Sequence, residues 1–191
     1  MRKLIYYIAI STDGFIAQSD GTFDVFPMQG EHIKDLIEDY PETMPAPARA
    51  ALGISTAPNR VFDAVLMGKA TYDVGAKHGL TSPYPQLDQY VVSRSLQEKP
   101  DPAVTLIREN PLAAVRALKA REGRALWLCG GSKLAAELFT EIDEVIVKIN
   151  PLLLGAGIPM FAGKVPPTNL RLVERKVYPN GYVRVHSVLE R

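Results

Sequence analysis

Short apolar runs alternate along most of the chain with segments in which apolar and polar residues follow a helical spacing. A short apolar run predicts a buried strand, whereas apolar positions three and four apart predict an amphipathic helix. Strands are expected at residues 4–10, 60–67, 89–92, 104–107, 125–129 and 144–149. Helices are expected at residues 31–40, 111–121 and 132–139, with a shorter one that begins near Thr71. This alternation predicts an α/β fold with right-handed crossovers and a mostly parallel sheet.

The last part of the chain departs from that alternation. Residues 170–178 and 182–190 are two strand-like runs joined by Pro179-Asn180-Gly181. Because Asn-Gly between such runs is a strong signal for a β-hairpin, antiparallel strands are expected at this end of the sheet. Two earlier segments are predicted to be irregular: a loop over residues 15–26, and a proline-rich excursion over residues 41–58 with one short helix near residues 48–52.

Length and charge narrow the classes of protein to consider. The 191 residues predict one domain, residues 1–191, that is large enough for a sizeable core. The formal net charge of +1 creates no overall field that would attract nucleic acid or an anionic membrane. No apolar run approaches the roughly 20 residues of a membrane-spanning helix. We therefore expect neither a nucleic-acid partner nor a membrane partner.

Cysteine and histidine usage argues against a metal site. Cys129 is the only cysteine, so the chain forms neither an internal disulfide nor a cysteine-based zinc site. The three histidines, His32, His78 and His186, share no spacing typical of metal ligands. We expect no metal, and the single cysteine is consistent with a reducing compartment such as the cytoplasm.

The turn Cys129-Gly130-Gly131-Ser132 is the most visible candidate for ligand binding. A buried strand ends there, two glycines turn the chain, and a helix begins at once. Glycine allows the backbone to approach a ligand closely, and the N–H groups at a helix start suit a phosphate. The alternative is a plain turn in which Ser132 caps the helix.

Two further turns have a similar chemistry. Gly68 ends a predicted strand and is followed by Lys69 and Thr71, which suit a phosphate but also suit a capped helix with a solvated lysine. Ser93 and Arg94 follow the next strand, and the arginine fork suits a terminal phosphate such as the 2′-phosphate of NADPH. The alternative for Arg94 is a solvated surface residue.

These three turns carry more weight together than singly. Each follows the carboxyl end of a predicted parallel strand, and ligands of open α/β sheets bind along that edge. Three phosphate-suited turns on one edge indicate a long ligand with several phosphates. Neither G-x-G-x-x-G nor G-x-x-x-x-G-K-[ST] is present, so any nucleotide is bound by another scheme.

Five segments of the chain resemble, in order, the dihydrofolate reductase-like superfamily. They are Ser11–Ala17, Met67–Tyr72, Val92–Ser95, Cys129–Ser132 and Asn150–Phe161. Within it the chain is most similar to the C-terminal reductase domain of the riboflavin-pathway enzyme RibD. The resemblance implies a three-layer α/β sandwich with a mostly parallel central sheet, NADPH bound across the sheet edge, and a homodimer.

The resemblance also assigns roles to single positions. It places Ala9 and Ile16 beside the nicotinamide, although the family commonly has arginine where Lys69 stands. The positions that it assigns to the NADPH phosphates are Gly68, Lys69 and Thr71, then Ser93 and Arg94 at the 2′-phosphate, and Gly130, Gly131, Ser132 and Lys133 at the diphosphate.

A reductase of this kind also needs a proton donor, because hydride addition to a C=N acceptor requires protonation. Asp13 and Asp24, in the loop after the first strand, are the candidates, and Glu31 and Asp35 on the next helix are alternatives. Asp13 also fits a turn-forming role before Gly14. Asp24, Glu31 and Asp35 also fit solvated positions.

The expected activity is NADPH-dependent reduction of a pyrimidine- or pterin-like heterocycle. The substrate that the resemblance names is 5-amino-6-(5-phosphoribosylamino)uracil, although the chain lacks the H-x-E…P-C-x-x-C signature of the zinc deaminase that accompanies this reductase in RibD. The alternative is a non-catalytic nucleotide-binding or redox-sensing protein. The two hypotheses differ in one requirement: the reductase needs an acidic side chain that reaches the nicotinamide position, and the non-catalytic protein does not.

Overall fold

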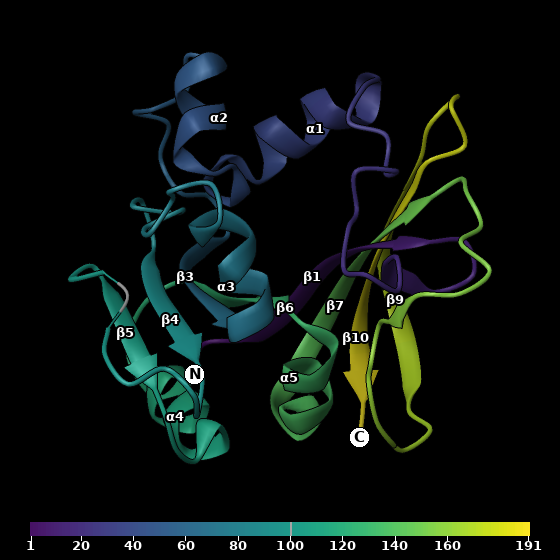
Figure 1. Ribbon diagram of the computed structural model, residues 1–191. Coiled ribbons are helices and arrows are strands. Elements are labelled where there is room, and N and C mark those ends of the chain that lie inside the picture. The colour runs from purple at the N-terminus through teal and green to yellow at the C-terminus, as the bar shows by residue number, and fades with distance from the viewer. Residues whose placement is uncertain (100) are drawn as a thin grey trace.

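The computed structural model describes residues 1–99 and 101–191 and is organised around an eight-stranded sheet (Figure 1). The strand order is β5-β4-β3-β6-β1-β7-β10-β9. The six strands from β5 to β7 are parallel to their neighbours, whereas β10 is antiparallel to both β7 and β9. The strands of this sheet are β1 (Leu4–Ser11), β3 (Phe62–Gly68), β4 (Asp88–Val92), β5 (Val104–Ile107), β6 (Ala125–Gly130), β7 (Ile142–Asn150), β9 (Asn169–Val177) and β10 (Val183–Glu190).

Helices cover both faces of the sheet and complete a three-layer sandwich (Figure 1). One face packs against α1 and α3, and the other packs against α4 and α5. The helices are α1 (Glu31–Asp39), α2 (Ala46–Ala51), α3 (Lys69–Ala76), α4 (Pro111–Lys119) and α5 (Ser132–Glu137), with 3-10 turns at Pro41–Thr43 and Phe139–Glu141. Among residues 1–99 and 101–191, no helix has both the length and the apolar character needed to cross a membrane.

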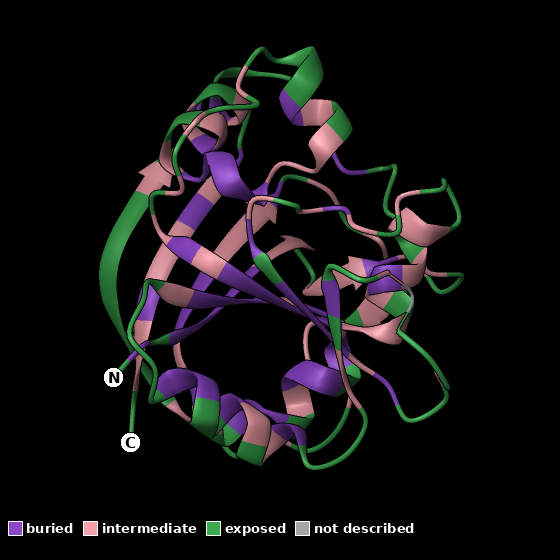
Figure 2. Ribbon diagram, turned by 90° about the vertical axis from the view of Figure 1, so that its left-hand side faces the viewer, coloured by how far each residue is buried: buried purple, intermediate pink, exposed green. Residues whose placement is uncertain are grey.

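The central strands are apolar on both faces because each face has its own helical layer. In β1, Leu4 and Tyr6 pack into the core beneath α4 and α5, while Ile5 and Tyr7 pack into the core beneath α1 and α3. At the far edge, β9 is the strand that Figure 2 colours almost entirely as exposed. The sheet therefore changes from a fully covered centre to a solvent-exposed edge.

The structure confirms the predicted α/β fold, the parallel sheet and the antiparallel hairpin across Pro179–Gly181. Each predicted strand and helix is present within a few residues of its expected bounds. The prediction of a plain loop over residues 15–26 was wrong at its start, where β2 (Phe15–Ala17) pairs with β8 (Ile158–Pro159). This pairing joins segments about 140 residues apart, which a local pattern does not reveal.

Trp127 lies in the core, as its place in an apolar strand predicts. It is 4% exposed, its indole Nε1 donates a 3.1 Å hydrogen bond to the carbonyl of Tyr7, and its ring packs edge-on against Tyr84. Tyr7, Tyr40 and Phe62 complete the aromatic cluster beneath α1. This cluster belongs to the core on the α1 and α3 face of the sheet.

Candidate active site

The carboxyl ends of β4, β3 and β6 lie side by side at one edge of the sheet, since β3 is hydrogen-bonded to both other strands. This order brings Gly68, Ser93 and Gly130, which are far apart in the sequence, to the same edge. The prediction that the three turns share one edge is thus confirmed. We call these turns and the loop after β5 the cofactor edge.

The backbones of the first and third turns approach each other closely at the cofactor edge. A Cβ added at Gly68 would lie 3.4 Å from the backbone nitrogen of Gly131, and one added at Gly131 would lie 3.4 Å from Thr71 Oγ1. Gly130 has a φ of +128° and is joined to Gly131 by a cis peptide bond. Because these glycines have no Cβ, the backbone N–H groups and the Thr71 hydroxyl lie close together with no side chain between them. This arrangement suits a phosphate.

The hydroxyls in these turns are not used as helix caps. Gly68 occupies the cap position of α3 and Gly131 that of α5, and neither helix has a side-chain cap hydrogen bond. The alternative in which Thr71 and Ser132 act only as caps is therefore wrong. Ser132 is buried at the start of α5, whereas Lys133 projects from the helix into solvent.

Lys69 lies beside the glycines but is paired on its own helix. Its Nζ forms an ion pair with Asp73 one turn further along α3, and both side chains are partly exposed. Such an exposed pair contributes little to stability. The contact holds the ammonium next to Gly68, where a phosphate would compete with Asp73 for it.

A hollow of about 530 Å³ lies at the end of the cofactor edge, beyond β4 and β5. It is lined by Arg94, Arg108, Glu109 and Asn110, so one carboxylate stands beside the two arginines. The Arg94 side chain is 82% exposed and makes only a long contact, 3.4 Å, with Glu137. Buried Ser93 is less available, because its Oγ accepts hydrogen bonds from the backbone N–H groups that follow it in the turn. Two arginines facing one hollow suit a phosphate dianion.

Arg108 was not among the residues expected from the sequence. It follows β5 directly, just as Ser93 and Arg94 follow β4, and Val92 is the register partner of Ile107. A systematic comparison of the residues after each parallel strand would have found it. Asn110 has a left-handed backbone conformation, with φ of +47°, and caps α4 by accepting from Ala113 N–H at 3.0 Å.

The nicotinamide end of the site was expected near Ala9 and Ile16. Ala9 is half-buried near the carboxyl end of β1, and Ile16 is half-buried on β2, which packs against β1. Ala9 is the register partner of Lys148 on β7. The two expected residues therefore lie on two strands that contact each other, β1 and β2.

Asp13 is exposed and forms a bridge between two loops. Its carboxylate accepts a 2.5 Å hydrogen bond from Ser11 Oγ and further bonds from the backbone N–H groups of Leu154 and Gly155. These hydrogen bonds lower the pKa of Asp13 below its ordinary value, and the bond from Ser11 has the largest effect. An ionised carboxylate held in this way favours a structural role over the donation of a proton.

Of the remaining acidic candidates, only one faces the sheet. Asp24 lies in an exposed turn and Glu31 lies exposed at the start of α1. Asp35 is half-buried; its Oδ2 accepts a 2.8 Å hydrogen bond from the Tyr178 hydroxyl and lies 3.4 Å from Lys176 Nζ. Asp35 is thus the alternative candidate that the fold places closest to the sheet.

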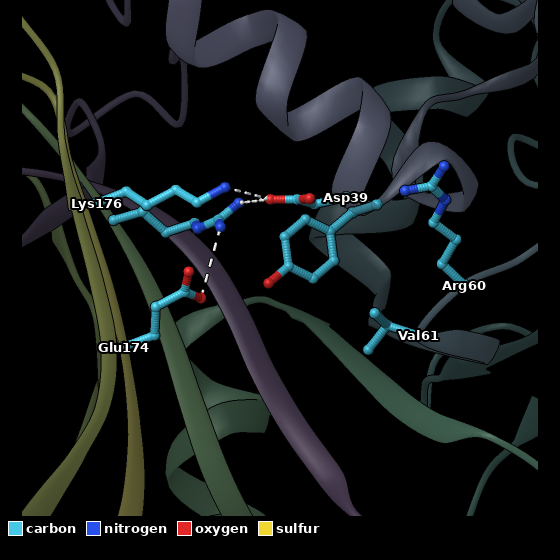
Figure 3. A pocket seen from close by; sticks show the side chains of 7 residues that line it. Asp39, Arg60, Val61, Glu174 and Lys176 are labelled. Carbon is cyan, nitrogen blue, oxygen red and sulfur yellow. Dashed lines mark hydrogen bonds and ion pairs between the residues drawn. The ribbon is translucent and has the colours of Figure 1, made fainter.

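A groove of about 360 Å³ lies between the end of α1, the start of β3 and the hairpin of β9 and β10 (Figure 3). The Arg184 side chain, 3% exposed, reaches Asp39 at 2.7 Å and Glu174 at 3.7 Å, and Lys176 reaches Asp39 at 3.1 Å. Burial alone would raise the pKa of Asp39, but the hydrogen bonds from Arg184 and Lys176 outweigh it and lower the pKa. Residues lining the groove are Asp39, Tyr40, Arg60, Val61, Glu174, Lys176 and Arg184.

The groove is a feature that the sequence did not indicate. Its charged residues come from three distant segments and have no shared motif. Across residues 1–99 and 101–191, no group of three or more His, Cys, Asp or Glu side chains is arranged to hold a metal ion.

The fold of this protein is that of a dihydrofolate reductase-like α/β protein. The dihydrofolate reductase of Enterococcus faecalis, solved with NADP(H), superposes with a TM-score of 0.64 at 13% identity, covering 99% of this chain and 97% of that one. A bifunctional diaminohydroxyphosphoribosylaminopyrimidine deaminase/5-amino-6-(5-phosphoribosylamino)uracil reductase of Thermotoga maritima gives 0.63 at 17% identity, covering 99% of this chain and 57% of that one.

Within that class, the chain belongs to the RibD C-terminal domain family, whose model matches residues 2–184. A relative over nearly the full length is the uncharacterised protein YwjB of Bacillus subtilis strain 168, which is 31% identical over 190 residues, or 98% of both chains. The family expected from the five sequence segments is thus confirmed.

Proposed function

We propose that this protein is an NADPH-dependent reductase. One observation carries the proposal: two groups of residues lie on a single sheet edge. Gly68, the Thr71 hydroxyl and Gly130-Gly131 lie close together there, and Arg94 and Arg108 lie further along the same edge. The glycine turns suit the diphosphate, and the arginines suit the 2′-phosphate. When bound, NADPH would supply a hydride to the substrate, while the protein supplies orientation and a proton.

We propose a pyrimidine- or pterin-like heterocycle as the substrate. The groove next to α1 supports this proposal, because it combines the Tyr40 ring with the exposed, charged side chain of Arg60, whereas Arg184 is buried and already paired with Asp39 and Glu174. An aromatic ring with a cation beside it suits a flat, polar ring that carries an anionic substituent. The first compound to test is 5-amino-6-(5-phosphoribosylamino)uracil.

A second candidate function is a nucleotide-binding or redox-sensing protein without catalysis. The observation that favours it is the state of the two expected acids, since Asp13 is held ionised in a loop contact and Asp24 is exposed. Turnover of any heterocycle with NADPH separates the two candidates. A protein that binds NADPH but transfers its hydride to none of the heterocycles tested would support the second candidate.

The test of the proposed function is a titration of wild type and variants with NADPH and with NADH. We expect Arg94→Ala and Arg108→Ala each to weaken NADPH about tenfold, because each removes a charge-assisted hydrogen bond to the 2′-phosphate, and to leave NADH within about threefold. Arg121→Ala, an exposed arginine in the loop between α4 and β6, is the matched control. Equal losses for both cofactors would rule out the 2′-phosphate role.

We further propose that the protein acts in the cytoplasm as a homodimer. The exposed edge strand β9 supports the dimer, because it leaves Leu172, Val173 and Val177 half or more exposed beside unpaired backbone groups. The single, half-buried Cys129, whose pKa burial raises to about 12, is consistent with a thiol that stays reduced.

A further inference from the structure

Lys148 occupies the centre of a row of three side chains, which lie near the carboxyl ends of β1 and β7 and at the amino end of β10. On β7 it is the register partner of Ala9 on β1 and of Arg184 on β10. Neighbouring strands are roughly 4.8 Å apart, so the row runs about 10 Å from the expected nicotinamide position to the groove beside α1. Lys148 thus lies between the two parts of the proposed site.

The contacts of Lys148 distinguish it from the other cations of this region. Its Nζ lies 3.9 Å from the centroid of the Tyr7 ring, and the Tyr7 and Tyr40 rings are 4.8 Å apart. Arg184 is neutralised by Asp39 and Glu174, whereas no carboxylate among the described residues lies within ion-pair distance of Lys148. An ammonium that has an aromatic ring but no carboxylate as partner is available to a ligand.

The groups that face Lys148 do not compete with it for a proton near neutral pH. Burial lowers the pKa of Lys148 to about 8, and the neighbouring Cys129 opposes that change only in part. Burial also raises the pKa of Cys129 to about 12 and that of Tyr7 well above its ordinary value, so both stay protonated. Arg184 stays charged because its pKa is raised.

We propose that Lys148 is the proton donor of the reductase, an inference that rests on the proposed function. The substrate carbon of a C=N bond accepts the hydride as NADPH is oxidised to NADP⁺, and the π electrons of that bond pass to nitrogen. The nitrogen takes a proton from Lys148 Nζ, so a C–H and an N–H bond form. Lys148 is left as a neutral amine and takes its next proton from water.

Lys148 satisfies the requirements for this role better than the acidic candidates do. A general acid functions best when its pKa lies near the working pH and when it is within reach of the reacting atom. Asp13 holds two loops together, and Asp35 is hydrogen-bonded to Tyr178. The lysine, by contrast, points over an aromatic ring between Ala9 and the groove.

The first test measures the amine itself and needs no substrate. Trace labelling with acetic anhydride from pH 6 to 11, followed by peptide mass spectrometry, gives the pKa of each lysine. We expect a value near 8 for Lys148, and slower labelling of Lys148 when NADPH saturates the protein, while the labelling of exposed Lys34 and Lys164 should not change on adding NADPH. An ordinary pKa at Lys148, or no protection by NADPH, would overturn the proposal.

The second test separates a proton donor from a mere positive charge. Lys148→Met removes both, while Lys148→Arg keeps the charge but cannot release a proton near neutral pH. We expect both variants to bind NADPH within about threefold of wild type and to lose kcat/KM by roughly 100-fold with the uracil substrate, or with any heterocycle that the wild type reduces. In wild type, kcat/KM should fall above pH 8, tenfold per pH unit; in the variants this decline should disappear.

The outcomes distinguish the two proposals. Full activity in Lys148→Met, or rescue by Lys148→Arg, would overturn the role of Lys148 and leave the reductase assignment intact. A wild type that binds NADPH but reduces no heterocycle would overturn both. If Lys148→Met lost NADPH binding while Lys148→Arg kept it, the positive charge of Lys148 would serve cofactor binding, which would contradict its role as the acid.

Discussion

The half of the sheet formed by β5, β4, β3 and β6 differs from the half formed by β1, β7, β10 and β9 in how its functional residues are assembled. In the first half, the residues proposed to bind the cofactor lie at or just after the carboxyl ends of parallel strands, as Gly68, Gly130 and Arg94 do. In the second half, Asp39, Lys148 and Arg184 come from a helix end and from the interiors of two strands. The two halves meet between β6 and β1.

This difference reflects the chemistry of the two proposed ligand ends. A phosphate is bound by backbone N–H groups and by exposed cations, which a strand-to-helix turn supplies locally. A flat heterocycle needs an enclosed surface with a few directed groups, and that surface forms only when distant segments pack together. The buried Arg184, with Asp39 and Glu174 as its partners, is an example.

The sharpest test of the first half is Gly131→Ala. The added Cβ lies 3.4 Å from Thr71 Oγ1, an ordinary contact, and the φ of −84° suits alanine. The fold should tolerate the methyl group, but a phosphate should lose its close approach to the backbone, so we expect NADPH binding to weaken about 100-fold. Binding titrations and thermal unfolding measure the two effects.

Gly75→Ala is the control for this prediction, because it adds a methyl group within α3, away from the Gly130-Gly131 turn; this methyl group would lie 3.3 Å from the carbonyl oxygen of Leu80, so the thermal unfolding of this variant is measured as well. It should leave NADPH binding unchanged. Wild-type affinity in Gly131→Ala would show that the phosphates lie elsewhere, and the first half would then lose its functional distinction from the second.

The first half was also the part that the sequence revealed best. Gly130-Gly131 and Ser93-Arg94 follow apolar runs, so a short window of residues shows both the strand and the turn. The parallel order of β4, β3 and β6 then follows from the alternation of strands and helices. Even Arg108, which was missed, could have been found by the same local criterion.

The second half can be tested with Arg184→Met. The substitution removes a buried cation and leaves Asp39 and Glu174 facing each other, so the free energy of unfolding should fall by about 2 kcal/mol, less than for a fully buried pair because both carboxylates are partly exposed. NADPH affinity should not change, since Arg184 lies outside the cofactor edge. Denaturant unfolding and NADPH titration measure the two effects.

Arg171→Met is the matched control. Arg171 lies on exposed β9 and makes only a 3.8 Å contact with Glu190, so its loss should cost under about 0.5 kcal/mol. A loss of NADPH binding in Arg184→Met would show that the two halves of the sheet are coupled rather than independent.

The groove and Lys148 show why the sequence left the substrate end unassigned. Lys148 is the single polar position within the run Val145–Ile149, which by itself predicts a solvated side chain. Only the pairing of β7 with β1 and β10 shows that its neighbours are Ala9 and Arg184. Side-chain chemistry that depends on strand order is therefore not visible until the order is known.

The smallest expected effect concerns Asp13, which joins the loops after β1 and β7 in the second half. Because its pKa is lowered, its hydrogen bonds to Leu154 and Gly155 should persist as the pH falls through the ordinary aspartate value of 3.8 and be lost only below it. Asp13→Asn should raise amide exchange at Leu154 and Gly155 about fivefold at neutral pH, because a neutral amide is a weaker acceptor. Hydrogen exchange read by mass spectrometry measures this change.

The same variant decides between the two roles of Asp13. A bridge between loops predicts faster exchange at Leu154 and Gly155, with a modest loss of turnover that follows it. A proton donor predicts the reverse, a large loss of kcat with exchange unchanged, and would restore Asp13 in place of Lys148. Because the Asp13 carboxylate is ionised at neutral pH and already accepts three backbone and side-chain donors, the first outcome is expected. Asp13 would then act on the substrate end only by holding the loop that follows β7.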